Sequence, residues 1–225
     1  MKLYYHPVST TCRPILLLAA DEDIKLDYQF VDLFKGEHMK PEYLAINPSH
    51  AVPVLEDGDL ILPESSAILK YLAEKAGSSA YPTELRRRAR VNSLMDWFNT
   101  GFYKDFGYGL VYAQVLPTFK HPDAKVQAAT IAASREKTRG WLKILDENLI
   151  GPRNAYVGGS EMTLADYVGV AYLTLGEVIR LDYAAYPNIC RWIATMKARP
   201  NWAKVNEGFY AHFVAPFKDA PFEGL

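Results

Sequence analysis

The chain is poor in the residues that staple small secreted proteins together or hold metal ions. It has only two cysteines, Cys12 and Cys190, and these lie far apart in a sequence of 225 residues. Neither the cysteines nor the five histidines show the spacing of metal ligands. The sequence therefore predicts neither a disulfide framework nor a metal site, and a reducing cytoplasm is the expected compartment.

An excess of charge and long apolar runs are also missing. The 25 basic and 26 acidic residues nearly cancel, so nothing points to a polyanionic partner or a membrane surface. No apolar run approaches membrane-spanning length, and the first residues lack the apolar core of a signal peptide. The single basic cluster, residues 86–90, is read as a solvated helix face or a subunit contact. A nucleic-acid patch is the alternative, but no aromatic or further basic stretch supports it.

What the chain does have is 49% apolar residues, enough for a sizeable core and most simply two domains. Its first part alternates between strand-like and helix-like periodicity, in the order β-α-β, a connection, then β-β-α. This order predicts a mixed sheet with helices packed on it. Asp57-Gly58 is a strong hairpin signal between the last two strands. The segments are residues 3–6, 12–21, 26–33, 52–56, 60–62 and 65–75.

The remainder of the chain is predicted to be entirely helical. Helical patterns cover residues 84–116, 122–149, 164–180, 187–198 and 200–212, with prolines at or near the breaks. We therefore expect an α/β domain over residues 1–78, a linker near 76–84 and an all-helical domain over 85–225. Thr163 and Asp166 resemble a capping box at a helix start, with an aspartate shorter than the usual glutamate, and we read this pair as structural.

Two short stretches of the α/β part suggest a binding site. Pro53 stands where a strand should begin, and it cannot donate a hydrogen bond to a sheet. Glu64, Ser65 and Ser66 put a carboxylate and two hydroxyls at a helix N-terminus, where free N–H groups and the helix dipole attract anions. Together these stretches indicate a site that holds a small zwitterion by its carboxylate and its ammonium group.

Four stretches, in register along the chain, carry a resemblance to a known family. The whole chain resembles a cytosolic glutathione transferase, closest to the serine-type delta and theta classes. The resemblance implies a thioredoxin-like N-terminal domain with a mixed four-stranded sheet, an all-α C-terminal domain, a homodimer and a role in detoxification. It also implies glutathione as co-substrate. The stretches are YYHPVSTTCR (4–13), GEHMKPEYL (36–44), NPSHAVPVL (47–55) and ESSAI (64–68).

The resemblance implies a role for each matching residue. The Ser9 hydroxyl would donate a hydrogen bond to the glutathione sulfur and favour the thiolate. A free thiol has a pKa of about 8.5, and lowering it by about two units corresponds to roughly 2.7 kcal/mol. Val52 would pair its backbone with the cysteinyl part of glutathione like an added strand. Pro53 would be cis, although X–Pro bonds without a family precedent are expected to be trans.

The remaining glutathione contacts follow the same resemblance. Glu64 would hold the ammonium of the γ-glutamyl group, and Ser65 its carboxylate, with help from the helix N-terminus. Ser66 stands where the delta class often has an arginine, so one positive contact would be missing. His38 and His50 would lie near the glycyl carboxylate.

The second substrate and the chemistry leave alternatives open. Tyr108, Tyr112 and Phe213 could line an apolar pocket for an electrophile facing Ser9, although most aromatics of the helical half are core. Ser9 could merely cap the following helix, and Tyr5 could be the hydroxyl donor instead.

Two further functions compete with the transferase. Cys12, at a helix N-terminus, could form a mixed disulfide with glutathione and make the protein a thiol reductase. Arg13, beside it, is expected to support the loop or to tune the thiolate. The same fold also serves as a non-catalytic binding or scaffold module.

Overall fold

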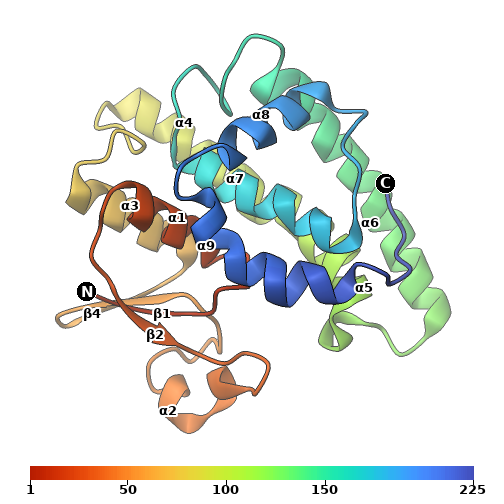
Figure 1. The fold of residues 1–225 in the computed structure, drawn as a ribbon, viewed down its shortest axis with the longest axis horizontal. Coiled ribbons are helices and arrows are strands. Elements are labelled where there is room, and N and C mark those ends of the chain that lie inside the picture. Colours follow the sequence, from red (N-terminus) through yellow and green to blue (C-terminus); the bar gives the residue numbers. More distant parts are fainter.

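The computed structural model describes residues 1–225, which form a sheet-bearing N-terminal part and a helical remainder (Figure 1). The sheet has the strand order β2-β1-β3-β4, with β1 and β2 parallel and the other two pairs antiparallel. The prediction of a mixed four-stranded sheet followed by a helical domain is therefore confirmed. The strands are β1 (Lys2–Tyr5), β2 (Asp27–Phe30), β3 (Val54–Asp57) and β4 (Leu60–Pro63).

Local sequence explains the hairpin between β3 and β4. Asp57 pairs with Leu60, which leaves Gly58 and Asp59 to make the turn, and Gly58 has a φ of 64° that glycine adopts without strain. The strand begins at Val54 rather than at the predicted residue 52. Pro53, which has no N–H to give to the sheet, immediately precedes it, and the Val52–Pro53 peptide bond is cis.

Two helices cover one face of the sheet. They are α1 (Arg13–Asp21) and α3 (Ser65–Ala76), and both lie between the sheet and the helical domain (Figure 1). Leu16 to Ala19 are all buried in α1, so this helix contacts apolar surface on both sides. The connection between β2 and β3 contains two short helical turns that periodicity did not predict, η1 (Glu37–Met39) and α2 (Pro41–Leu44).

The helical half agrees with the predicted segments to within a few residues. Its first segment runs without a break from residue 85 to 115, and wide π-type turns replace regular α-helix in its second half. None of the helices combines the length and the apolar character needed to cross a membrane. The elements are α4 (Leu85–Asp96), η2 (Trp97–Phe102), η3 (Lys104–Tyr112), α5 (Ala113–Val115), η4 (Pro117–Phe119), α6 (Ala124–Ile144), η5 (Leu145–Ile150), α7 (Leu164–Leu175), η6 (Gly176–Ile179), α8 (Pro187–Lys197), α9 (Trp202–Phe209), η7 (Tyr210–Val214) and η8 (Ala215–Phe217).

The central helix of this half, α7, begins at the predicted capping box. The Thr163 hydroxyl accepts the Ala165 N–H at 3.3 Å, and the Asp166 carboxylate accepts the Thr163 N–H at 2.8 Å. Asp166 also accepts the indole N–H of Trp192 at 2.9 Å, and burial raises its pKa to about 6. Every residue of α7 is buried, so the cap anchors the middle of the domain. Its structural role is confirmed.

Arg13 joins the two halves of the molecule. Its side chain is 1% exposed and points from α1 into the helical half. It donates to the Asn206 Oδ1 and the Thr174 Oγ1, both at 2.7 Å, and its guanidinium lies 3.7 Å from the centre of the Phe209 ring. Burial lowers the Arg13 pKa to about 10, which leaves the side chain charged at neutral pH. Arg13 therefore faces the domain interface and not a thiolate.

The basic cluster at residues 86–90 partly fixes the linker. Arg88 donates to the Pro82 carbonyl at 2.8 Å and stacks on the Tyr81 ring at 4.6 Å. Arg87 forms an ion pair with Glu161. These contacts tie the start of α4 to the linker and to the loop before α7.

Candidate functional site

A cleft of about 550 Å³ lies between the sheet half and the helical half of the molecule. Its walls come from the loop before α1, from the connection between β2 and β3, and from η3, η4 and η7 of the helical half. The structure therefore brings together residues that are far apart in the sequence. The predicted site residues that line this cleft are Ser9, His38, His50, Val52, Tyr108, Tyr112 and Phe213.

Ser9 lies in the turn that leads from β1 into α1. Its hydroxyl is 3.1 Å from the Thr11 hydroxyl, and its oxygen accepts the Cys12 N–H at 3.4 Å. The Ser9 carbonyl accepts the Cys12 and Arg13 N–H groups at 3.0 and 3.1 Å, which fixes the backbone of the turn. Ser9 thus makes a weak capping contact and lines the cleft at the same time.

The loop before β3 presents backbone groups to the cleft. The Ala51 carbonyl accepts from the Tyr43 hydroxyl at 2.7 Å and from the Asn47 side-chain amide at 2.8 Å. The carbonyl of Val52 accepts from the Thr11 hydroxyl at 3.2 Å, whereas its N–H has no partner in the protein. Pro53 is buried and does not line the cleft. A free N–H in a fixed loop is what an extended ligand needs for strand-like pairing.

The two predicted histidines lie on the same side of the cleft. His38 belongs to η1, and its Nδ1 atom is buried without a hydrogen-bond partner. His50 is exposed and has a φ of 55°, a conformation that is uncommon for a residue with a Cβ. A buried polar atom without a partner is destabilising unless a ligand or water supplies one.

The N-terminus of α3 lies beside the cleft but outside its lining. Glu64 takes the N-cap position with no side-chain capping bond, so Ser65 and Ser66 are the first two residues of the helix. Glu64 is exposed and has a φ of 71°. Strained backbone conformations of this kind are found mostly at functional sites. Burial, and then the charge of Glu64, raise the pKa of Tyr108, which places this carboxylate within electrostatic reach of the helical wall.

Aromatic rings form the helical wall of the cleft. Tyr108 and Tyr112 lie on η3, and the Phe119 ring packs against both, at 5.4 and 5.6 Å between ring centres. The Tyr112 hydroxyl is bonded to the Thr10 hydroxyl at 2.7 Å and to the Tyr103 hydroxyl at 2.8 Å. Burial raises the Tyr112 pKa to about 12, so this phenol stays protonated at neutral pH.

The cleft is also lined by several residues that the sequence did not predict. Thr10 and Thr11 directly follow Ser9, and their hydroxyls were an unused signal. Leu33, Phe34 and Phe119 carry no motif, and only the folded chain brings them to the cleft.

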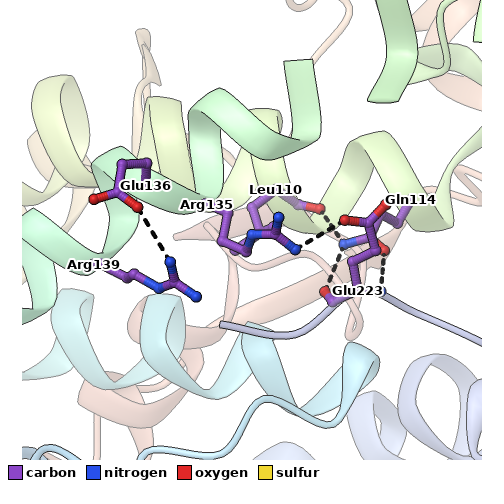
Figure 2. Close-up of polar contacts among 6 residues, drawn as sticks. All are labelled: Leu110, Gln114, Arg135, Glu136, Arg139 and Glu223. Carbon is purple, nitrogen blue, oxygen red and sulfur yellow. Dashed lines mark hydrogen bonds and ion pairs between the residues drawn. The ribbon is translucent and has the colours of Figure 1, made fainter. Parts of the chain in front are cut away.

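The C-terminal segment holds this wall from outside. Figure 2 shows Glu223 against Arg135 of α6 and Gln114 of α5. The Arg135 guanidinium donates to the Glu223 carboxylate at 2.9 Å, and the Glu223 N–H donates to the Gln114 side chain at 2.7 Å. Gln114 in turn donates to the Leu110 carbonyl at 3.0 Å. The end of the chain is thus attached to the helical segment whose inner face carries Tyr108 and Tyr112.

Neither Cys12, the alternative nucleophile, nor Tyr5, the alternative hydroxyl donor, lines the cleft. Cys12 is 0% exposed, and burial raises its pKa to about 11, which disfavours the reactive thiolate. Tyr5 lies in β1 with its ring 5.3 Å from that of Tyr28, and it does not line the cleft. Of the hydroxyls proposed as donors from the sequence, only that of Ser9 borders the cleft on the sheet side.

Comparison with known proteins identifies two family domains in the chain. Residues 3–80 match the model described as glutathione S-transferase, N-terminal domain, and residues 110–200 match the glutathione S-transferase, C-terminal domain. A delta-class glutathione transferase from Nilaparvata lugens is 33% identical, with 96% of this chain and 98% of that chain covered and a TM-score of 0.80. Human glutathione transferase theta-2, solved with glutathione and an unknown ligand, is 29% identical, with 97% and 89% covered and a TM-score of 0.84. Human glutathione S-transferase T1-1 in its apo form is 25% identical, with 99% and 92% covered and a TM-score of 0.81.

Proposed function

The chain belongs to the glutathione S-transferase family, and from that premise we propose that it is a serine-type enzyme acting on apolar electrophiles. The observation that carries this proposal is the composition of the cleft. The Ser9 hydroxyl borders it from the sheet half, and Tyr108, Tyr112 and Phe213 border it from the helical half. A polar contact for sulfur and an apolar surface thus face the same space.

The reaction begins with ionisation of the glutathione thiol. Ser9 donates a hydrogen bond to the sulfur, which favours the thiolate over the thiol, and the thiol proton passes to solvent. A sulfur electron pair then forms a carbon–sulfur bond with the electrophile. The leaving group departs with the electrons of the bond that breaks, or, in an addition, the neighbouring atom takes up those electrons and then a proton.

Glutathione binds along the sheet half in this proposal. Its cysteinyl backbone pairs with the N–H and carbonyl of Val52, next to the cis Pro53. Its γ-glutamyl group lies at the α3 N-terminus, with the ammonium on Glu64 and the carboxylate on Ser65, Ser66 and the helix dipole. Its glycyl carboxylate lies near His38 and His50, and the unpartnered Nδ1 of His38 supports a polar ligand there.

Replacing Ser9 tests the proposal. The Ser9→Ala variant should lower turnover of a model electrophile by roughly 10²–10³-fold, the scale for losing one preorganised donor. It should leave glutathione affinity within a few fold, because most contacts lie elsewhere, and it should raise the pKa of the bound thiol. Thiolate absorbance against pH measures that pKa.

Two rival functions have their own outcomes in the same experiment. Cys12→Ala is the matched control, and it should change neither turnover nor the thiol pKa. If Cys12→Ala abolishes activity and Ser9→Ala keeps it, the protein is a thiol reductase. If no member of a panel of halides, epoxides, isothiocyanates and peroxides reacts, the scaffold function replaces the enzyme.

The proposal includes a homodimer in the cytoplasm, where detoxification by reduced glutathione would take place. Leu85 at the start of α4 is 78% exposed, next to Arg86, and a two-fold partner would cover this corner. Cys12 is buried and Cys190 is exposed, and neither is paired in a disulfide. Sedimentation at micromolar concentration should give twice the chain mass, and a monomer mass would rule out the dimer.

A further inference from the structure

The Thr11 hydroxyl lies between the two groups that the proposed function uses to hold the cysteinyl part of glutathione. It is 3.1 Å from the Ser9 hydroxyl on one side and 3.2 Å from the Val52 carbonyl oxygen on the other. No other hydroxyl in the protein bonds to Ser9. Thr11 lines the cleft, so the three groups form a short row along its sheet side.

The direction of each hydrogen bond in this row is fixed by the number of protons. A carbonyl oxygen only accepts, so the single Thr11 hydroxyl proton points to Val52. The Thr11 oxygen then accepts the proton of Ser9. The Ser9 oxygen accepts the Cys12 N–H at 3.4 Å. The Ser9 proton is therefore engaged by Thr11 in the free protein and is not directed at the cleft.

We propose that Thr11 is a positioning residue that couples pairing of glutathione with the Val52 backbone to release of the Ser9 proton toward sulfur. This inference rests on the proposed function. The ligand N–H competes with the Thr11 proton for the Val52 carbonyl oxygen, and the displaced Thr11 proton turns to the Ser9 oxygen. The Ser9 proton turns to the thiolate. Each hydroxyl keeps one donated bond, so the exchange leaves no group unpaired.

The sign of the effect follows from charge. With the neutral thiol bound, Thr11 donates to a Ser9 hydroxyl whose own acceptor is uncharged. With the thiolate bound, it donates to Ser9 and strengthens a bond to a charged sulfur. Bonds to charged groups are about twice as strong as neutral ones, so Thr11 stabilises the thiolate form more than the thiol form.

Neighbouring titratable groups do not supply this effect. Cys12, the N-cap residue of α1, and Tyr112 on η3 have pKa values raised by burial to about 11 and about 12, so both are neutral when glutathione ionises. Thr10 points away from Ser9, because its hydroxyl bonds to Tyr112 at 2.7 Å. Thr10 is therefore a matched control for the loss of one hydroxyl from the same turn.

The test is a set of isosteric changes in the whole protein, with the pKa of bound glutathione read from thiolate absorbance. Thr11→Val should raise that pKa by about 0.2–0.6. This is the effect of losing a cooperative strengthening of about 10–30% in one hydrogen bond to a charged group. It should lower kcat about two- to four-fold for the same reason. Thr11→Ser should keep both values, and Thr10→Val should leave the thiol pKa unchanged.

Two further measurements make the result decisive. In a Ser9→Ala background, Thr11→Val should have no further effect on the thiol pKa, because Thr11 acts through Ser9. If Thr11→Val does not fold, Thr11→Ala serves instead, with melting temperature and glutathione affinity as checks of the fold. An unchanged or lowered thiol pKa in these variants overturns the inference, and so does an equal shift in the Ser9→Ala background.

The failure of this inference is distinguishable from the failure of the proposed function. If Ser9→Ala raises the thiol pKa but Thr11→Val does not, only the coupling through Thr11 is wrong. If Ser9→Ala leaves the thiol pKa unchanged, Ser9 is not the donor, and the role of Thr11 is overturned with it.

Discussion

The sheet side of the cleft presents backbone groups and short polar side chains, whereas the helical side presents aromatic rings. The sheet side is built by tight loops, in which Tyr43 and Asn47 hold the Ala51 carbonyl in front of β3. The helical side is built by η3 and η4 together with η7, which lies far from them in the sequence. Hydrogen bonds are directional and apolar contacts are not. In the proposed function, the constant co-substrate binds on the first side and a range of electrophiles on the second.

In the proposed function, local sequence motifs bind the ligand on the sheet side, whereas on the helical side such motifs stabilise the fold. The largest expected effect is at Asp166, the third residue of α7 and the acidic member of its capping box. Its pKa in the folded protein is about 6, above the usual value for aspartate, because burial disfavours the charge. The folded state therefore binds a proton that the unfolded state has released between about pH 4 and pH 6.

The sign of the pH dependence follows. The contribution of Asp166 to the free energy of unfolding should be greatest below pH 4 and should fall by up to about 3 kcal/mol as pH rises to 6. We expect the wild type to lose stability relative to Asp166→Asn over this window in urea titrations. Asp166→Asn should be less stable at every pH, since an amide cannot accept from Val157, Thr163 and Trp192 together. A pH-independent difference would contradict the raised pKa.

On the sheet side, Glu64 tests whether a motif residue binds the ligand. Glu64→Ala should weaken glutathione binding at least tens of fold, because truncating one partner of a charged pair that the ligand buries costs about 2–5 kcal/mol. Glu64→Gln should lose most of this affinity as well, since it keeps the shape and removes the charge. Calorimetry at neutral pH measures both. Unchanged affinity in either variant would remove the γ-glutamyl group from the α3 N-terminus.

On the helical side, single aromatic rings should matter less, and only for the electrophile. Tyr108 and Phe119 pack at 5.4 Å between ring centres, and both are partly exposed to the cleft. Removing either ring should raise the KM for an apolar electrophile by about 2–10-fold, the effect of losing one aromatic pair contact. Glutathione affinity should stay within two-fold. Steady-state kinetics with each substrate varied separately would show whether the two sides are independent.

The C-terminal segment gives the smallest expected effect. Glu223→Ala removes an exposed ion pair with Arg135 and should lower the melting temperature by only about 1–2 °C. Hydrogen exchange of residues 215–225 should nevertheless become faster, because this pair attaches the end of the chain to α6 (Figure 2). Glu136→Ala is the matched control, since its partner Arg139 lies on the same helix. Equal exchange in both variants would show that the Glu223 pair does not hold the segment.

Sequence alone predicted the features that depend on neighbouring residues. The Asp57-Gly58 turn, the capping box at Thr163 and the prolines at helix breaks are local, because each is determined by φ preferences or by bonds over three or four residues. The resemblance then suggested the glutathione contacts, and the Ser9 and Val52 loops do border one cleft. Their roles in binding and catalysis remain predictions.

Only the tertiary structure decided which distant groups meet. Arg13 could have served a thiolate, but burial among Asn206, Thr174 and Phe209 makes it a contact between the two halves. Cys12 looked reactive at a helix start, yet its complete burial raises its pKa. The same holds for the pairing of Thr11 with Val52 and for the packing of Phe119 on Tyr112. Burial and contacts between distant segments depend on how the helices pack on the sheet, and no local pattern in the sequence encodes that packing.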